Sequence, residues 1–266
     1  MPPLLSVVMP VMNGERFIEE ALRCALASEV DLEIIVQDGG STDATAEIVA
    51  SLGDRRVSFL SESDQGQADA LNRAIRRARG RWILWLNADD FVDPSAVSRL
   101  SSTLMNTEAT LVYGDFAIVD VAGRPIRSYE CPGHWSRGSL LDTGLRVFSG
   151  SIFLDRTLLC SLGGFDNRLH YCMDYELLIR IIPEARLLYV PGVIGSFRMH
   201  SGSKSGSVPW RFFREYRSIQ SKYRSSGLWG RVKSYNAQSR LALFTATSRF
   251  RYSRTWSRIR PTKRFS

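Results

Sequence analysis

The sequence predicts an α/β protein with a mostly parallel central sheet and helices on both of its faces. Short apolar runs and amphipathic helical patterns alternate four times within the first 90 residues, which is typical of βαβ units. The apolar runs are continuous rather than alternating, as expected for strands that are buried on both faces. Each run also ends at a polar or glycine-containing turn, where a crossover to a helix would begin.

The first unit opens with the run Leu4-Leu5-Ser6-Val7-Val8-Met9, and Pro10 is expected to end this strand because proline lacks a backbone donor. Asn13 is the expected N-cap of the following helix. The apolar residues of that helix recur at helical spacing and should face the core: Phe17, Ile18, Ala21, Leu22 and Ala25.

The next units follow the same pattern. A strand is predicted over 32–36, and Ser41 or Thr42 is expected to open a helix whose inward residues are Ile48, Val49 and Leu52. A third strand over 57–60, a helix over 67–78 and a fourth strand over 82–86 come next. Asp93 followed by Pro94 predicts a capped helix that starts at Ser95.

Beyond residue 108 the pattern is less regular. Strands are predicted over 111–113, 151–154 and 187–190, and a short helix over 174–182. Residues 115–150 carry little secondary-structure signal.

Charge divides the chain into two parts. Residues 1–203 carry 19 Lys and Arg against 26 Asp and Glu, whereas residues 204–266 carry 16 Lys and Arg against the single acid Glu215. We therefore expect an acidic domain over 1–203, with halves 1–107 and 108–203, and a basic tail over 204–266. The four cysteines show no metal-binding spacing, and neither a signal peptide nor an 18-residue apolar run is present, so a reduced, cytoplasmic protein is expected.

Polar residues collect where the predicted strands end. Asn13, Asp38 and Asp64 follow the first three strands, Asn87, Asp89 and Asp90 follow the fourth, and Asp69 starts the next helix. Taken singly, each is an ordinary turn or cap residue. Together, so many acids at the carboxyl edge of a parallel sheet repel one another unless a cation neutralises them, and oxygen ligands favour Mg²⁺ or Mn²⁺ over zinc.

The glycine-rich phosphate-binding patterns GxGxxG and GxxxxGK[ST] are both missing. This argues against a dinucleotide-dependent oxidoreductase and against a P-loop nucleotidase.

Six segments, in order, resemble glycosyltransferase family 2, the inverting nucleotide-sugar transferases of GT-A fold, over roughly residues 4–205. They are SVVMPVMNGERFIEEAL, EIIVQDGGSTDAT, SESDQGQADALNRAI, GRWILWLNADD, GGFDNRLHYCMDYELLIRI and FRMHSGSKS. The resemblance implies a Rossmann-like GT-A catalytic domain over 1–203 that transfers a sugar from a nucleotide-diphospho-sugar to an acceptor. Residues 1–107 would bind the nucleotide-sugar and residues 108–203 the acceptor, with acceptor selection expected in 115–150.

The resemblance also implies roles in donor binding. Pro10 and Val11 would line the base pocket with Asn13 beside them, Asp38 would accept a hydrogen bond from the nucleobase, and Asp64 and Asp69 would lie near the base and ribose. In the family's DxD motif the first position is usually Asp, but here it is Asn87, which would bond a ribose hydroxyl without adding charge at the metal.

The metal and the catalytic base come from the same resemblance. Asp89 would be the main metal ligand, flanked by Asp90, with His200 reaching the metal or a phosphate. Arg198 and Lys204 would add positive charge at the diphosphate. Asp174, in MDYELLIRI, would be the general base that deprotonates the acceptor hydroxyl, although an acid there also suits the start of a helix.

Residues 210–224 of the tail predict an amphipathic helix with an aromatic stripe and a cationic face. The stripe is Phe212, Phe213, Tyr216, Ile219 and Tyr223. It would either pack on the body or lie on an anionic membrane surface, and the two are compatible if packing is partial. Nucleic-acid binding would also suit the charge, but no recognition motif accompanies it.

The expected function is therefore transfer from a UDP-sugar, with thymidine and guanosine donors left open, to a glycan or glycolipid acceptor at the cytoplasmic face of a membrane. One alternative is a sugar-1-phosphate nucleotidyltransferase, which should carry a glycine-rich basic loop after its first strand. The other is a non-catalytic nucleotide-sugar-binding protein of the same fold, for which Asn87 gives some support.

Overall fold

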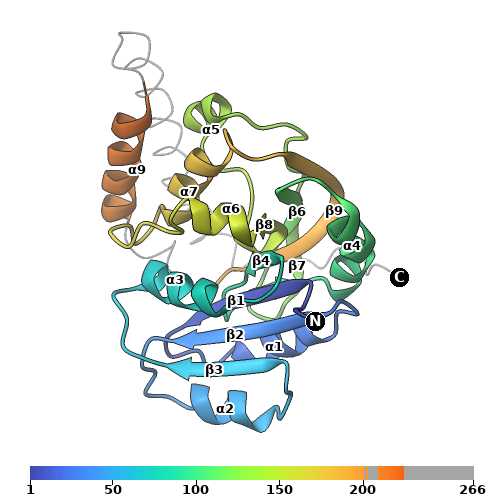
Figure 1. Ribbon diagram of the computed structural model, residues 1–266. Coiled ribbons are helices and arrows are strands. Elements are labelled where there is room, and N and C mark those ends of the chain that lie inside the picture. The colour runs from blue at the N-terminus through green and yellow to red at the C-terminus, as the bar shows by residue number, and fades with distance from the viewer. Residues whose placement is uncertain (201, 203–208, 225–266) are drawn as a thin grey trace.

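The computed structural model describes residues 1–200, 202 and 209–224, and their strands form one nine-stranded sheet. The strand order is β3-β2-β1-β4-β8-β6-β9-β5, with β7 paired to β6 (Figure 1). The predicted first half is confirmed: β1 (Leu5–Val11), β2 (Leu32–Asp38), β3 (Val57–Ser61) and β4 (Trp82–Trp85) are parallel neighbours.

The second half of the sheet mixes directions. It contains β5 (Phe91–Val92), β6 (Leu111–Val119), β7 (Pro125–Tyr129), β8 (Ile152–Asp155) and β9 (Leu187–Arg198). β8 lies antiparallel between β4 and β6, whereas β6 and β9 run parallel. The carboxyl end of β9 is thereby brought towards the residues that follow β4, through the antiparallel pairing of β5 with β9.

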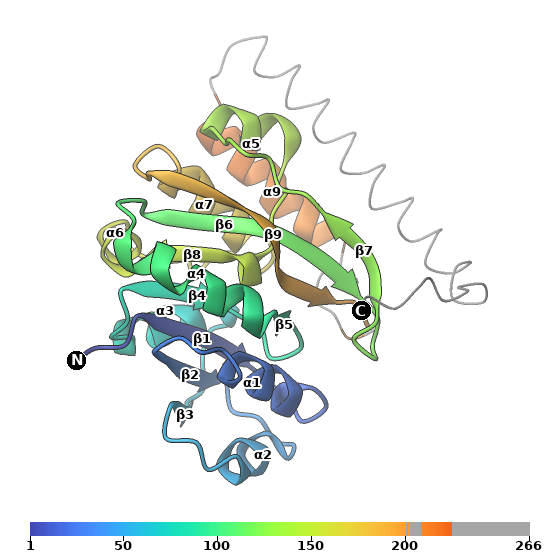
Figure 2. The same cartoon turned by 90° about the vertical axis from the view of Figure 1, so that its right-hand side faces the viewer.

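Helices cover both faces of the sheet (Figure 2). One apolar core joins the sheet to α1 (Ile18–Leu26), α2 (Thr45–Ser51) and α4 (Pro94–Asn106). The opposite core joins it to α3 (Gln67–Arg77), α5 (Arg137–Thr143), α6 (Arg156–Ser161), α7 (Met173–Ile181) and α9 (Pro209–Tyr223). A single turn of 3-10 helix, η1 (Ser149–Ser151), precedes β8. The α/β class with helices on both faces is confirmed.

The expected end of the first strand at Pro10 was wrong. β1 continues to Val11, and Pro10 pairs with Gln37 of β2. The backbone carbonyl of Val8 accepts from Leu86 on the β4 side, so the missing N–H of Pro10, two residues later, faces the same side. The β1–β4 pairing ends at Val8 and Trp85, and the proline therefore costs the ladder no hydrogen bond.

Two helix starts also differ from the prediction. Asn13 does not cap α1: it adopts a φ of 53°, and its Oδ1 accepts from the backbone N–H of Thr42 at 2.9 Å. α1 begins at Ile18 and α2 at Thr45, three or more residues later than expected. The cap of α4 is confirmed, since the Asp93 carboxylate accepts from the backbone N–H groups of Ser95 and Ala96.

The short or irregular strands were not predicted from the sequence, or only in part. β5 has two residues and β7 is largely exposed, so neither produces a hydrophobic run. β9 was predicted only to residue 190, but the strand continues past Pro191 and Gly192. There the Gly192 N–H donates to Asp115 Oδ2 at 2.9 Å, and the register with β6 shifts.

The tail helix α9 was predicted over 210–224 and is present at Pro209–Tyr223. Tyr216 and Ile219 of its aromatic stripe are buried, and Tyr216 stacks on Tyr175 of α7 with ring centroids 5.0 Å apart. Residues 225–266 of the predicted tail, and the boundary at Ser203, lie outside the described residues.

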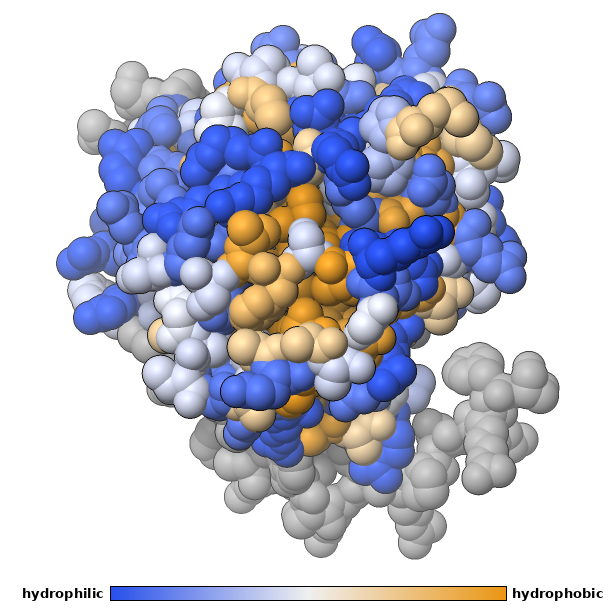
Figure 3. All heavy atoms as spheres, turned by 60° about the horizontal axis from the view of Figure 1, so that its bottom comes forward, coloured by the Kyte–Doolittle hydropathy of each residue, from blue (hydrophilic) through white to orange (hydrophobic). Residues whose placement is uncertain are grey.

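One face of the molecule carries hydrophobic residues gathered around a hollow and bordered by hydrophilic ones (Figure 3). Over the described ranges no helix combines the length and the apolar character that a membrane crossing needs.

Candidate active site

A cavity of about 1020 Å³ lies at the carboxyl ends of the parallel strands. Eight of the residues predicted for the site line it: Pro10, Val11, Asn13, Asp64, Asn87, Asp89, Asp174 and His200. They come from segments separated by up to 190 residues, and the sheet order brings them together. Among the described residues, Asp38, Asp69 and Asp90 are not part of this lining.

Asp38 shapes the loop beside the cavity. Its carboxylate is buried and accepts from the Ser41 N–H at 2.9 Å and the Ser61 hydroxyl at 2.6 Å, with further bonds from Gly40 and the Ser41 hydroxyl. Burial alone would raise the pKa of Asp38, but these hydrogen bonds outweigh it and the pKa is lowered. The ionised carboxylate therefore fixes the turn after β2 rather than facing the open space.

Gly39, the first glycine after Asp38, has a specific role. It lines the cavity, and a Cβ at this position would lie 2.7 Å from Oδ2 of Asp64. The other oxygen of Asp64, Oδ1, accepts from the Gly66 N–H at 2.8 Å. The missing side chain at residue 39 therefore makes room for the Asp64 carboxylate in the cavity wall, and the double glycine after Asp38 was the available signal.

Asp69 supports this wall from behind. It is largely buried, accepts from the Gln65 N–H at 3.2 Å and pairs with Arg73 at 2.8 Å. Burial would raise the pKa of Asp69, but the Gln65 N–H and the Arg73 guanidinium lower it further than burial raises it. Its contacts stabilise the turn that presents Asp64.

The turn after β4 is organised by Asn87. Its Oδ1 accepts from Trp85 Nε1 and Gln67 Nε2, both at 2.8 Å, and its Nδ2 donates to Asp90 Oδ2 at 2.8 Å. A carboxylate could not make the last of these bonds because it has no donor. Asn87 thus joins the cavity wall to a buried acid.

Asp90, predicted to flank the metal, is fully buried behind the turn. Its second oxygen accepts from the backbone N–H of Arg198 at 2.9 Å. Burial, and then the negative charge of Asp89, raise the pKa of Asp90. One oxygen is bonded within the turn, to Asn87, and the other is bonded to β9 at Arg198, so Asp90 has a structural position rather than one open to the cavity.

Asp89 and His200 meet across 111 residues of sequence. Asp89 Oδ2 lies 2.9 Å from His200 Nε2, and Phe17 packs beside the imidazole with centroids 4.9 Å apart. His200 Nδ1 accepts from the Gly202 N–H at 3.2 Å. The side chain of Asp89 is 31% exposed, so the pair borders the open cavity.

The pair fits a small divalent cation. Adjacent ligands around an octahedral Mg²⁺ or Mn²⁺ with bonds of about 2.1 Å lie about 3 Å apart, close to the observed 2.9 Å. Within the part of the chain that the structure describes, no cluster of three or more His, Cys, Asp or Glu could hold a metal ion. Such ions are usually bound by one or two protein ligands, and substrate phosphates and waters complete the coordination shell.

Arg198 does not reach the cavity as predicted. It is buried between the rings of Phe17 and Phe91, donates from Nε to the Asp89 carbonyl at 2.9 Å, and pairs with Glu20 at 2.7 Å. Its positive charge is used to hold the turn that carries Asp89. Lys204 lies outside the described residues.

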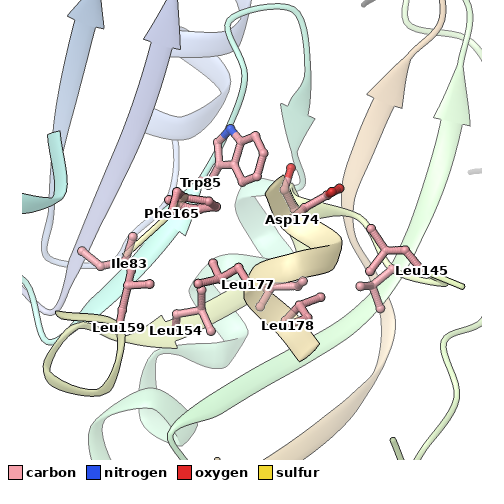
Figure 4. A pocket seen from close by; sticks show the side chains of 12 residues that line it. Ile83, Trp85, Leu145, Leu154, Leu159, Phe165, Asp174, Leu177 and Leu178 are labelled. Carbon is pink, nitrogen blue, oxygen red and sulfur yellow. The ribbon is translucent and has the colours of Figure 1, made fainter. Parts of the chain in front are cut away.

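Asp174 stands in the first turn of α7, beside Trp85 of β4 (Figure 4). Its Oδ1 accepts from the N–H of Tyr175 at 2.7 Å. Below it is a small apolar pocket of about 30 Å³, whose lining includes Ile83, Leu154, Leu177 and Phe165. The carboxylate is therefore placed where an apolar floor meets the main cavity, which it also lines.

Comparisons with known proteins agree with this architecture. The model of the family described as glycosyl transferase family 2 matches residues 6–157. An uncharacterized glycosyltransferase of Rickettsia prowazekii is 28% identical over 77% of this chain and 67% of its own length. A PGL/p-HBAD biosynthesis glycosyltransferase of Mycobacterium bovis is 28% identical over 80% of this chain and 83% of that protein.

Solved structures share the fold. TarS 1-349 of S. aureus in complex with UDP-GlcNAc has a TM-score of 0.67 at 20% identity, and the match covers 84% of this chain and 66% of TarS 1-349. The mannosyltransferase PcManGT of Pyrobaculum calidifontis, in complex with GDP-Man and Mn²⁺, has a TM-score of 0.60 at 21% identity, covering 93% and 74%. The chain spans about a third of the length of some rickettsial relatives.

The matched family segment covers more than half of the chain and includes β1 to β8 of the sheet that carries the cavity. The chain belongs to glycosyl transferase family 2.

Proposed function

We propose that this chain transfers a sugar from a nucleotide-diphospho-sugar to a hydroxyl group of an acceptor, with inversion at the anomeric carbon. The observation that carries this proposal is one cavity lined both by the Asp89–His200 pair and by Asp174. Solved neighbours hold UDP-GlcNAc and GDP-Man, which supports a nucleotide-sugar donor of this general kind. Family membership speaks against the sugar-1-phosphate nucleotidyltransferase alternative.

The donor would lie along the edge formed by β1 to β4. The space for the base is bordered by Pro10, Val11 and Asn13. The carboxylate of Asp64, which packs against Gly39, would accept hydrogen bonds from the base or the ribose. We propose UDP as the nucleotide, with GDP as the principal competitor because PcManGT is bound to GDP-Man.

A divalent cation, Mn²⁺ or Mg²⁺, would be held by Asp89 and His200. When bound, such an ion neutralises charge on the departing diphosphate. Asp89 and His200 orient the phosphate end of the donor, and Arg198 keeps Asp89 in place through its backbone carbonyl. Trp85 and Phe165 exclude water beside Asp174, whose carboxylate accepts the proton of the attacking hydroxyl.

The acceptor would enter over the second half of the sheet. Aromatic side chains line this part of the cavity, among them Phe116, Phe148, Phe197 and Phe212. Such a surface suits the faces of sugar rings and the apolar part of a glycolipid. We propose a glycan or glycolipid acceptor, in keeping with the relative named for PGL/p-HBAD biosynthesis.

Cytoplasmic contact with an anionic membrane surface belongs to the same proposal. The stripe of α9 is packed on the body, so contact there would be electrostatic, through the exposed Arg211, Arg214 and Arg217. The protein should sediment with phosphatidylglycerol vesicles at low salt and stay in the supernatant at high salt. It should not sediment with phosphatidylcholine vesicles. Equal binding to both lipids would contradict this part.

The test of the catalytic proposal separates chemistry from binding. Asp174→Asn should lower turnover of UDP-N-acetylglucosamine or GDP-mannose, followed as nucleoside diphosphate release, by at least about 100-fold. Calorimetric affinity for the corresponding diphosphate should stay within about twofold, because Asp174 is not expected to contact it. A parent protein that binds both donors but turns over neither would favour the non-catalytic binding alternative.

A further inference from the structure

Glu215, on α9, is the single acid among residues 204–266, and its carboxylate is hydrogen-bonded to another part of the chain. Its carboxylate accepts three consecutive backbone N–H groups: His170 at 3.0 Å on Oε1, and Tyr171 at 2.8 Å and Cys172 at 3.0 Å on Oε2. Consecutive N–H groups that converge on one carboxylate form a strong, charge-assisted anchor.

This anchor lies at the start of the helix that carries Asp174. Cys172 is the N-cap residue of α7, and its side chain makes no capping bond. The three N–H groups lie just before the first turn of α7, on His170, Tyr171 and Cys172, so a carboxylate from a distant segment fixes the backbone that leads into the helix. Asp174 follows two residues after Cys172.

The anchored segment is also a wall of the cavity. His170, Tyr171, Met173 and Asp174 line the space, and so does Phe212, one turn before Glu215 on α9. A shift of the segment would therefore move the carboxylate of Asp174 relative to the donor and change the shape of the wall at the same time.

The rest of α9 is held firmly enough to act as a support. Gln220 Nε2 donates to the Leu141 carbonyl at 2.9 Å and to the Tyr175 hydroxyl at 2.5 Å. The Tyr223 hydroxyl donates to Glu176 Oε1 at 2.6 Å. These contacts, one turn apart along α9, fix it against α5 and α7 and place Glu215 beside the residues that precede Asp174.

We propose that Glu215 is a positioning residue that holds the first turn of α7, and with it the Asp174 carboxylate, at the wall of the cavity. This inference rests on the proposed function for Asp174 as the base. It gives the basic C-terminal segment a role in catalysis that is separate from any contact with a membrane.

The first test is amide hydrogen exchange in the full chain, comparing the parent with Glu215→Gln and Glu184→Gln. The control makes the same substitution at an exposed residue just beyond the other end of α7. Exchange at residues 170–173 should become at least tenfold faster in Glu215→Gln and stay unchanged in Glu184→Gln, with the sheet protected in both. Unchanged exchange at 170–173 overturns the proposal.

The second test measures turnover of UDP-N-acetylglucosamine and GDP-mannose. Glu215→Gln should lower kcat about tenfold with KM for the donor within twofold, and Glu215→Asp should recover part of the loss. Combined with Asp174→Asn, Glu215→Gln should cause no further loss, because it acts through the base. An equal loss in both backgrounds overturns the proposal.

The two hypotheses fail in different ways. Full turnover in Asp174→Asn contradicts the proposed function of the base. Loss of turnover in Asp174→Asn together with parent-like turnover in Glu215→Gln contradicts only the role of Glu215.

Discussion

Asn87 shows how one side chain decides the chemistry at the turn after β4. The first position of the DxD motif is usually an aspartate. Here it is Asn87, whose amide nitrogen donates to the fully buried Asp90. Buried polar atoms need hydrogen-bond partners, and among the described residues Asn87 and the backbone N–H of Arg198 donate to the Asp90 oxygens. The charge available to a cation at this turn is therefore that of Asp89.

Asn87→Asp should destabilise the protein. It would replace a donor by a second acid beside the buried Asp90, at a cost of about 2–3 kcal/mol in the free energy of unfolding. Urea unfolding at pH 7 measures this. Asn106→Asp, at the exposed end of α4, is the control; it loses a bond to the Ser102 carbonyl and should cost less than about 1 kcal/mol. Equal stability of Asn87→Asp and the parent would show that Asp90 does not need this donor.

The ion pair between Asp54 and Arg56 should make the stability of the protein depend on pH. The Arg56 side chain and backbone hydrogen bonds lower the pKa of Asp54 to about 2. A carboxyl whose pKa is lower in the folded state stabilises that state above its unfolded pKa, near 3.9, and this contribution is lost as the pH falls towards 2.

Asp54→Asn should therefore be slightly less stable than the parent at pH 7, by under about 1 kcal/mol because the pair is partly exposed. The difference should shrink between pH 4 and pH 2. Urea unfolding of both proteins at pH 7, 4 and 3 measures it. A difference that grows towards low pH would contradict the assignment.

At the scale of elements, the strands and helices of the first half could largely be predicted from the sequence. In the second half, the predictions located β6, β8, β9 and α7 at least in part but missed β7, α5 and α6. Continuous apolar runs identified β1 to β4 because these strands are buried on both faces. β5, with two residues, and β7, which is exposed, carry no such signal. β9 was cut short in prediction because Pro191 and Gly192 interrupt its pattern, although Asp115 holds the backbone there.

The amphipathic pattern of α9 was predicted, but its partner was not. The same aromatic stripe suits a protein surface or a membrane, and only contacts with the rest of the chain, such as the stacking of Tyr216 on Tyr175, distinguish them. Local periodicity fixes which side of a helix is apolar but says nothing about what covers it.

Tyr216→Ala tests the packing of α9. Removal of a buried ring that stacks on Tyr175 and bonds Gln220 should cost about 3 kcal/mol in the free energy of unfolding. Trp210→Ala, on the same helix but 70% exposed, should change it by less than about 0.5 kcal/mol. Thermal and urea unfolding give both values, and similar small effects for the two variants would contradict the packed position of α9.

At the scale of the whole molecule, the sheet order explains why the candidate site was predictable only in part. Polar residues at the ends of the parallel strands had to share an edge, so Asp64, Asn87 and Asp89 could be predicted from topology alone. The meeting of Asp89 with His200 depends on β9 lying parallel to β6 and paired to β5, which no local pattern encodes. Burial separated Asp90 and Arg198 from the cavity, and sequence cannot show burial directly.

The most direct test of the central claim, that Asp89 and His200 hold a cation against a nucleoside diphosphate, is calorimetric binding of UDP with and without Mn²⁺. GDP, dTDP and CMP serve as comparisons, and the proteins are the parent, Asp89→Ala and the exposed control Asp31→Ala. Mn²⁺ should raise the affinity of the parent and of Asp31→Ala for one diphosphate at least about tenfold, and Asp89→Ala should lose that increase. Failure of every nucleotide to bind, or equal binding by Asp89→Ala in Mn²⁺, would contradict the account.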